Sequence, residues 1–176
     1  MSTKLALPCL LVLAAMIGPA SAAEPAPGEA PHGGIRLVGR PDAIEHPVVT
    51  LGAQGAQVYE CKAAADGKLT WSFREPIATL IDSGKTVGRH YAGPNWELQD
   101  GSAVTAKVLG STGGTESDIP WLKLEVTAHR GSGALSEVST VQRINTHGGK
   151  LEGPCDKAGE FKSVPYSADY VFFKKG

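Results

Sequence analysis

The sequence predicts an all-β fold, an antiparallel β-sandwich or partly closed β-barrel of about eight to ten strands with one disulfide. Apolar and polar residues alternate in several segments, which is the pattern of strands with one covered face. Turn signals containing glycine separate these segments. No stretch of about eleven or more residues carries a helical apolar stripe. A chain of 176 residues, 41% of them hydrophobic, is sufficient for one domain with a buried core.

The strands are placed by the period-two alternation of their side chains. It predicts strands over 69–74, 104–108, 122–128 and 166–172, with shorter candidates over 56–61, 77–81 and 137–146. The intervening turn signals, such as Asp66-Gly67, Ser83-Gly84 and Asp100-Gly101, have the spacing of an antiparallel meander. At most one short helical turn is expected, near Ala63 to Ala65.

The first two dozen residues have the pattern of a secretory signal peptide. Lys4 supplies a positive start, residues 5–17 are apolar, and residues 18–23 are small enough for cleavage near Ala22 or Ala23. The alternative is a membrane anchor, but the uninterrupted apolar run 9–17 is only about half of the roughly 20 residues needed to cross hydrocarbon. We therefore expect a secreted protein, periplasmic or extracellular, with no membrane span after cleavage.

The chain is accordingly divided into three parts. Residues 1–23 are expected to be the signal peptide. Residues 24–46 are expected to form a flexible leader that runs into the domain, because prolines and glycines alternate there with residues too small to build a core. Residues 47–176 are expected to form a single β domain.

The cysteines predict a disulfide. Signal cleavage removes Cys9 and leaves Cys61 and Cys155, an even number in an oxidising compartment, for which only one intramolecular pairing exists. The alternatives are two buried free thiols or a metal site that uses both sulfurs. Neither cysteine lies in a C-x-x-C or C-x-x-H context, so we expect the Cys61–Cys155 bridge.

Several classes of function find no support in the sequence. The net charge is −1, so the chain lacks the excess of positive charge that a nucleic-acid binder normally carries. There is no G-x-S-x-G nucleophile elbow and no H-E-x-x-H pair. No two histidines stand at H-x-H or i,i+4 spacing, and methionine is absent after the signal, which excludes a thioether copper site. We therefore expect no metal and no cofactor.

One segment, residues 87–102, concentrates polar and aromatic side chains around a Gly-Pro turn. We expect the main cavity mouth of the domain to be lined by His90, Tyr91, Asn95, Trp96 and Asp100, with Arg143 a candidate for the facing wall. The competing interpretation is purely structural: Trp96 plugs a barrel end, and Asn95 and Asp100 close turns.

Two functions from different classes follow from this segment. The favoured one is a non-catalytic module that binds a small polar ligand, a glycan or a partner protein, because aromatic faces beside amide and carboxylate groups suit such ligands. The alternative is a hydrolase or metal-assisted enzyme that uses His90 with Asp100 or Glu97 on the same loop. Catalysis requires His90 to reach a carboxylate, whereas binding requires only accessible aromatic faces.

Several ordered blocks of the sequence are specific enough to compare with known families. They are V-Y-E-C at 58–61, H-Y-A-G-P-N-W-E-L-Q-D-G-S at 90–102, I-P-W-L at 119–122, V-Q-R-I-N-T-H-G-G at 141–149 and V-P-Y-S-A-D-Y at 164–170. Over about residues 48–174 the chain resembles the bacterial and fungal secreted proteins of domain of unknown function family 3455. The resemblance implies an exported β-rich domain and supplies no established activity. Some fungal members carry a malate dehydrogenase label, which these residues do not support because no dinucleotide-binding fold is readable.

Overall fold

The computed structural model describes residues 44–176. The predicted signal peptide, residues 1–23, and nearly all of the predicted leader lie outside the described residues. Within them the chain forms eight strands and no helix, and the first strand begins inside the segment expected to lead into the domain. The strands are β1 (Glu45–Ala63), β2 (Leu69–Asp82), β3 (Lys85–Tyr91), β4 (Asn95–Leu98), β5 (Ala103–Thr112), β6 (Trp121–Arg130), β7 (Thr140–Gly148) and β8 (Phe161–Lys175).

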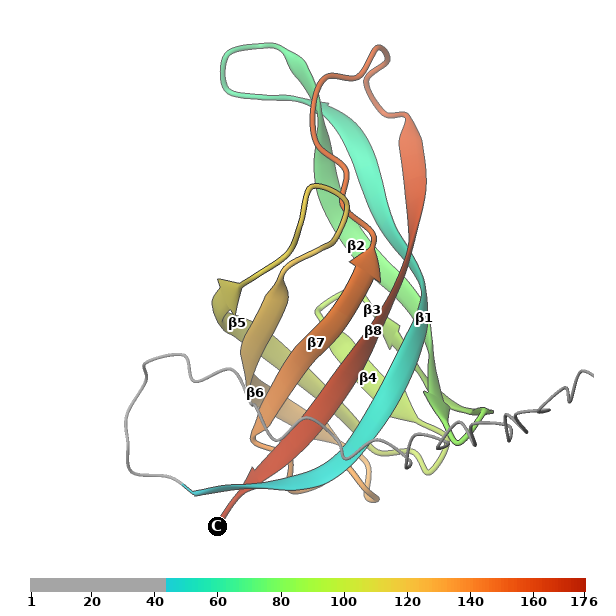
Figure 1. The fold of residues 1–176 in the computed structure, drawn as a ribbon, viewed down its shortest axis with the longest axis vertical. Coiled ribbons are helices and arrows are strands. Elements are labelled where there is room, and N and C mark those ends of the chain that lie inside the picture. Colours follow the sequence, from blue (N-terminus) through green and yellow to red (C-terminus); the bar gives the residue numbers. More distant parts are fainter. Residues whose placement is uncertain (1–43) are drawn as a thin grey trace, which may run out of the picture. The chain divides into compact units, whose positions relative to one another are not determined.

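These strands form a closed antiparallel barrel in sequence order (Figure 1). Each strand pairs with its neighbours along the chain, and β8 returns to pair with β1 from Glu45 opposite Lys175 to Glu60 opposite Phe161. The predicted all-β antiparallel fold is thereby confirmed, with eight strands. Closure pairs the first and last strands with each other, so these two strands, the longest of the described residues, leave no long sheet edge with unpaired backbone groups.

The β2 strand joins two segments that the sequence predicts as separate strands, 69–74 and 77–81. The strand continues through Pro76, which pairs with Gln57, and a bulge precedes it: Val58 pairs with Glu75 while Tyr59 pairs with Phe73, leaving Arg74 as the extra residue on β2. The predicted apolar face of 69–74 is only partly covered, because Phe73 remains 55% exposed. In Figure 1 the ends of β1, β2 and β8 extend past β3 and β4, so fewer strands are available there to cover this face.

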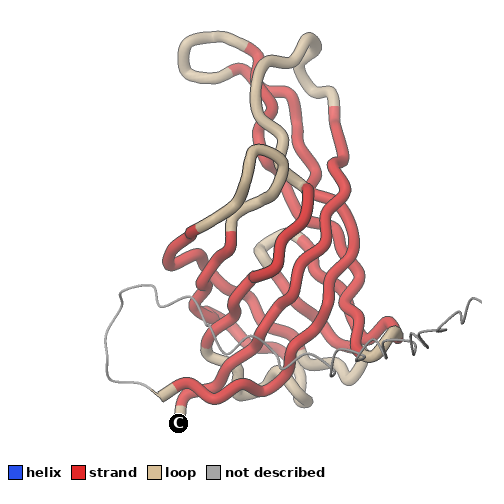
Figure 2. Tube along the Cα trace, in the orientation of Figure 1, coloured by secondary structure: helices blue, strands red, loops and turns tan. Residues whose placement is uncertain are grey.

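The predicted disulfide is confirmed. Cys61 of β1 is bonded to Cys155, with the two Cα atoms 5.9 Å apart. Backbone hydrogen bonds support the same connection, from the Trp71 amide to the Gly153 carbonyl and from the Cys155 amide to the Leu69 carbonyl. The bridge therefore fastens the long connection between β7 and β8 to the β1–β2 hairpin. Between β1 and β2, where the sequence allowed one short helical turn near Ala63 to Ala65, the chain forms a turn and no helix. Loops and turns connect the strands of the barrel (Figure 2).

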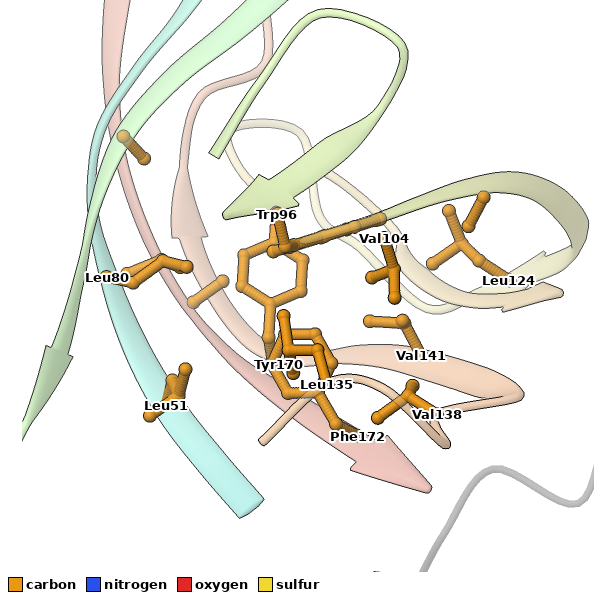
Figure 3. Close-up of a cluster of buried hydrophobic side chains, with 14 of the residues drawn as sticks. Leu51, Leu80, Trp96, Val104, Leu124, Leu135, Val138, Val141, Tyr170 and Phe172 are labelled. Carbon is orange, nitrogen blue, oxygen red and sulfur yellow. The ribbon is translucent and has the colours of Figure 1, made fainter. Parts of the chain in front are cut away.

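The hydrophobic core fills the end of the barrel at which β8 ends. Buried side chains from β1, β2, β4, β5, β6, β7 and β8 meet there (Figure 3). Leu135 and Val138, from the connection between β6 and β7, are completely buried and close this end. The connection is held in place because the Ala134 amide donates to Asp100 and the Leu135 amide donates to the Ser102 hydroxyl. The labelled members of the cluster are Leu51, Leu80, Trp96, Val104, Leu124, Leu135, Val138, Val141, Tyr170 and Phe172.

Candidate functional site

The β3–β4 hairpin separates the polar and aromatic residues of the 87–102 segment onto two faces of the sheet. His90 pairs directly with Trp96, and Tyr91 pairs directly with Asn95. Residues that lie opposite each other in an antiparallel pair project from the same face, and successive residues project from opposite faces. His90 and Trp96 therefore enter the barrel together, while Tyr91 and Asn95 belong to the other face.

Inside the barrel, His90 and Trp96 form an aromatic cluster with Tyr170. The rings of His90 and Trp96 are stacked, with centroids 4.5 Å apart and an interplanar angle of 12°. The Tyr170 ring contacts both, at 4.9 Å from His90 and 5.3 Å from Trp96. Since His90 is 3% exposed and Trp96 1% exposed, this cluster is part of the core as well as a wall of the interior.

The protonation state of His90 follows from its surroundings. Its Nδ1 lies 2.8 Å from the carbonyl oxygen of Asn95, and because a carbonyl oxygen only accepts, Nδ1 carries the proton. Burial lowers the pKa of His90 to about 4, and the positive charge of Arg143 acts in the same direction, against the hydrogen bond to Asn95. At neutral pH the imidazole is therefore neutral, with Nε2 free of a proton.

Arg143 projects from β7 into the same interior. It is 8% exposed, and its Nε and Nη2 atoms donate to the carbonyl oxygen of Pro120 at 3.1 and 2.8 Å. Among residues 44–176 no carboxylate pairs with this guanidinium, whereas more exposed cations of the barrel, including Arg74, Lys123 and Arg130, do form ion pairs. A buried charge without a counter-charge is energetically costly, which makes Arg143 the most unusual side chain of the interior.

A cavity of about 250 Å³ lies between these groups. It is larger than the about 150 Å³ of an engineered cavity that accepts benzene, and slightly smaller than the usual range of ligand pockets, about 300 to 1,000 Å³. Its position on the side of the β3–β4 turn places it away from the end closed by Leu135 and Val138. The residues around it are Gln57, Phe73, Arg74, Pro76, His90, Ala92, Gly93, Pro94, Trp96, Val108, Leu122, Leu124, Arg143 and Tyr170.

The structure brings together three of the six candidate residues, His90, Trp96 and Arg143. The other three, Tyr91, Asn95 and Asp100, were expected at the same cavity mouth but do not line this cavity. Asn95 instead joins the hairpin turn to β5, because its side chain donates to the Ala92 carbonyl and accepts from the Thr105 hydroxyl. The backbone pairing explains the difference, because alternation sends neighbouring side chains to opposite faces.

Asp100 closes a turn, as the structural interpretation of the sequence expects. Its carboxylate accepts hydrogen bonds from the Ser102 amide at 2.8 Å, the Ser102 hydroxyl at 2.6 Å and the Ala134 amide at 2.8 Å. These hydrogen bonds, chiefly that from the Ser102 side chain, lower the pKa of Asp100. Asp100 thus positions the loop that closes the packed end of the barrel.

Glu97 belongs to a charged cluster on the outer face. Its carboxylate accepts from the Tyr91 hydroxyl at 2.9 Å and is paired with Arg89 and Arg130 at 3.1 and 2.7 Å. The hydrogen bond from Tyr91, followed by those from Arg89 and Arg130, lowers the pKa of Glu97. The structure therefore does not unite His90 with Asp100 or Glu97. Within the described part of the chain, no group of three or more His, Cys, Asp and Glu side chains is placed to hold a metal ion.

Two polar residues that line the cavity, Gln57 and Tyr170, are not among the site residues predicted from the sequence. Gln57 is 2% exposed, and its Nε2 has no hydrogen-bond partner among the described residues; the same is true of Trp96 Nε1. A signal for Gln57 was present in the sequence, since it continues the inward-facing alternation of Leu51 and Ala53 with a polar side chain. Tyr170 lay on a predicted apolar face, and nothing in its spacing distinguished it from core.

The fold and this interior define the class of the protein: a small antiparallel β-barrel stapled by a disulfide, with an internal cavity that contains a buried arginine. Among residues 44–176 there is no helix long and apolar enough to cross a membrane. The chain belongs to the family described as "Protein of unknown function (DUF3455)", whose sequence profile matches residues 41–174. No curated protein and no solved structure matches the chain.

Proposed function

We propose that the barrel is a non-catalytic binding module that holds one small molecule in its interior. The observation that carries this proposal is the cavity of about 250 Å³ between the His90–Trp96 stack and Arg143. Apolar walls with a few convergent polar groups are the usual composition of a small-molecule site. Pro76, Leu122 and Trp96 supply apolar walls here, and Gln57 and Arg143 supply the polar groups.

The burial of the aromatic rings favours a small ligand over a glycan or a partner protein. Glycan and protein recognition would use accessible aromatic faces, whereas Trp96 is 1% exposed inside the barrel. The enzymatic alternative has less support, because Asp100 closes a turn and Glu97 is paired on the outer face. The proposed setting of the module is outside the cytoplasm, periplasmic or extracellular; the Cys61–Cys155 bridge supports this, since such bonds persist in oxidising compartments.

The proposal is tested by filling the cavity. Leu122 lines it, and Leu109 is an exposed residue of β5 that does not, so Leu122→Trp and Leu109→Trp add the same ring at two different places. With the neutral probe 2-naphthol in isothermal titration calorimetry, Leu122→Trp should weaken binding about tenfold or more, because the indole takes the space that the probe needs. Leu109→Trp should bind as the unmodified protein does. Equal binding by both variants, or no binding by the unmodified protein, would contradict the proposal.

A further inference from the structure

We propose that the ligand is a monoanionic organic acid whose carboxylate is bound by the guanidinium of Arg143. This inference rests on the proposed function and assigns the chemistry of the same cavity. Arg143 lines that cavity with a positive charge that no carboxylate of residues 44–176 neutralises, and two other residues of its lining, Gln57 and Trp96, carry buried donors without an acceptor among those residues.

The guanidinium of Arg143 is only partly used by the protein. Its Nε and Nη2 atoms share one edge of the planar group, and both donate to the single carbonyl oxygen of Pro120. This contact orients the group, and no carboxylate in the described part of the chain accepts from its Nη1 atom. Arginine offers five N–H donors in a fixed fork that matches the two oxygens of a carboxylate. The Tyr170 hydroxyl lies close enough for Arg143 to oppose the rise in the pKa of Tyr170 that burial causes.

The other unpartnered groups are also donors. Gln57 Nε2 and Trp96 Nε1 are buried, and neither makes a hydrogen bond within residues 44–176. Buried polar groups without partners are rare in native proteins, and each unsatisfied donor costs free energy until an acceptor is supplied. An acceptor with several lone pairs, such as a carboxylate, can satisfy donors from more than one wall. A cation, in contrast, would meet the same sign of charge on Arg143.

The charge of the cavity favours a single negative charge. The only other arginine at the cavity, Arg74, is bound on the outside by Glu60 and Glu75 at 3.6 and 3.1 Å. One unpaired guanidinium therefore remains to neutralise the ligand, which suits a carboxylate better than a phosphate dianion. Most of the other residues around the cavity, including Pro76, Leu122 and Leu124, are apolar, so the body of the acid should be apolar and about one or two rings in size.

The test compares acids with amides of the same shape. Binding of 2-naphthoic acid and 2-naphthamide, and of benzoic acid and benzamide, is measured by isothermal titration calorimetry at neutral pH on the full mature chain. Each acid should bind about tenfold or more tightly than its amide, because a charge-assisted hydrogen bond is roughly twice as strong as a neutral one. Arg143→Met should remove this preference, and Arg143→Lys should restore part of it by restoring the charge without the fork.

Arg89→Met is the matched control, since it removes a positive charge from the outer face, where Arg89 is paired with Glu97. It should leave the preference for the acids unchanged. A merely structural role of Arg143 would alter the melting temperature without changing the ratio of acid to amide affinity. If acid and amide bind equally to the unmodified protein, the inference is wrong while the proposed function stands. If neither pair binds and 2-naphthol also fails to bind, both are wrong.

Discussion

His90 illustrates how burial in a core moves the titration of a histidine well below physiological pH. Its imidazole is stacked on Trp96 and bonded to a backbone carbonyl, so the neutral form fits the site and the protonated form does not. Burial lowers the pKa to about 4, and Arg143 adds to the effect. In the unfolded chain the same imidazole has a pKa of about 6.5. The unfolded state therefore binds more protons in the window between these two values.

We predict that the free energy of unfolding decreases as the pH falls through this window. Between pH 7 and pH 5 the loss attributable to His90 should be about 2 kcal/mol, because protonation stabilises only the unfolded chain there. Urea denaturation at pH 7 and at pH 5 measures this loss of unfolding free energy. His90→Gln should abolish most of the difference, whatever its effect on absolute stability, whereas His147→Gln, at an exposed position, should preserve it. A pH dependence that persists in His90→Gln would show that other groups cause it.

At the scale of elements, the β3–β4 hairpin shows how far the sequence could predict the site. The density of polar and aromatic residues in 87–102 directed attention to His90 and Trp96, which both line the cavity, but density does not say which face each side chain occupies. Once the turn is known, pairing of His90 with Trp96 puts both inside, and Tyr91 must then face outward. The register depends on the geometry of the Gly93-Pro94 turn, which residue spacing alone did not specify.

Arg143 was identified by the opposite route, from a single charge in a strand-like run. The alternation in β7 places it on the face of Val141, which is completely buried. What the sequence could not reveal is the absence of a carboxylate partner, because pairing depends on strands that are remote along the chain. A snorkelling or ion-paired arginine has the same sequence pattern as one that faces a cavity.

The connection between β7 and β8 depends on the disulfide more than on packing. Most of its residues are exposed, and the bridge encloses a loop with a sequence separation of 94. We predict that the double variant Cys61→Ala, Cys155→Ala loses about 4 to 5 kcal/mol of unfolding free energy, because the unfolded chain regains the entropy of the open loop. Guanidinium denaturation measures this loss. Dithiothreitol should lower the stability of the unmodified protein by a similar amount and leave the double variant unchanged; a variant as stable as the unmodified protein would contradict the entropic account.

For the whole molecule, the sequence could predict the class of fold but not its closure. Strands with one apolar face have the same alternation in a sandwich and in a barrel, since both architectures cover one face of an antiparallel sheet. The two differ in the partner of the first strand. Here β1 pairs with β8 along most of its length, so the ring closes between residues at the two ends of the domain. Pairing over such a separation leaves no signal in local spacing.

The closed barrel is packed at one end and hollow toward the other, and the two halves should respond differently to the same truncation. Leu80 is completely buried in the packed cluster, whereas Leu122 packs against that cluster and borders the cavity. Leu80→Ala should cost about 2 to 5 kcal/mol of unfolding free energy, because it creates a new void in a close-packed core. Leu122→Ala only enlarges an existing space, so its cost should be smaller, on the order of 1 kcal/mol.

Urea denaturation of both variants, combined with titration of 2-naphthoic acid, measures the difference directly. The effect on the affinity for 2-naphthoic acid should be the reverse of the effect on stability. Leu122→Ala changes a wall that the ligand contacts and should alter the affinity, whereas Leu80→Ala should leave the affinity of the folded protein nearly unchanged. Equal losses of stability in the two variants would mean that the core extends through the barrel in solution and that the cavity around Arg143 is filled by the protein's own side chains.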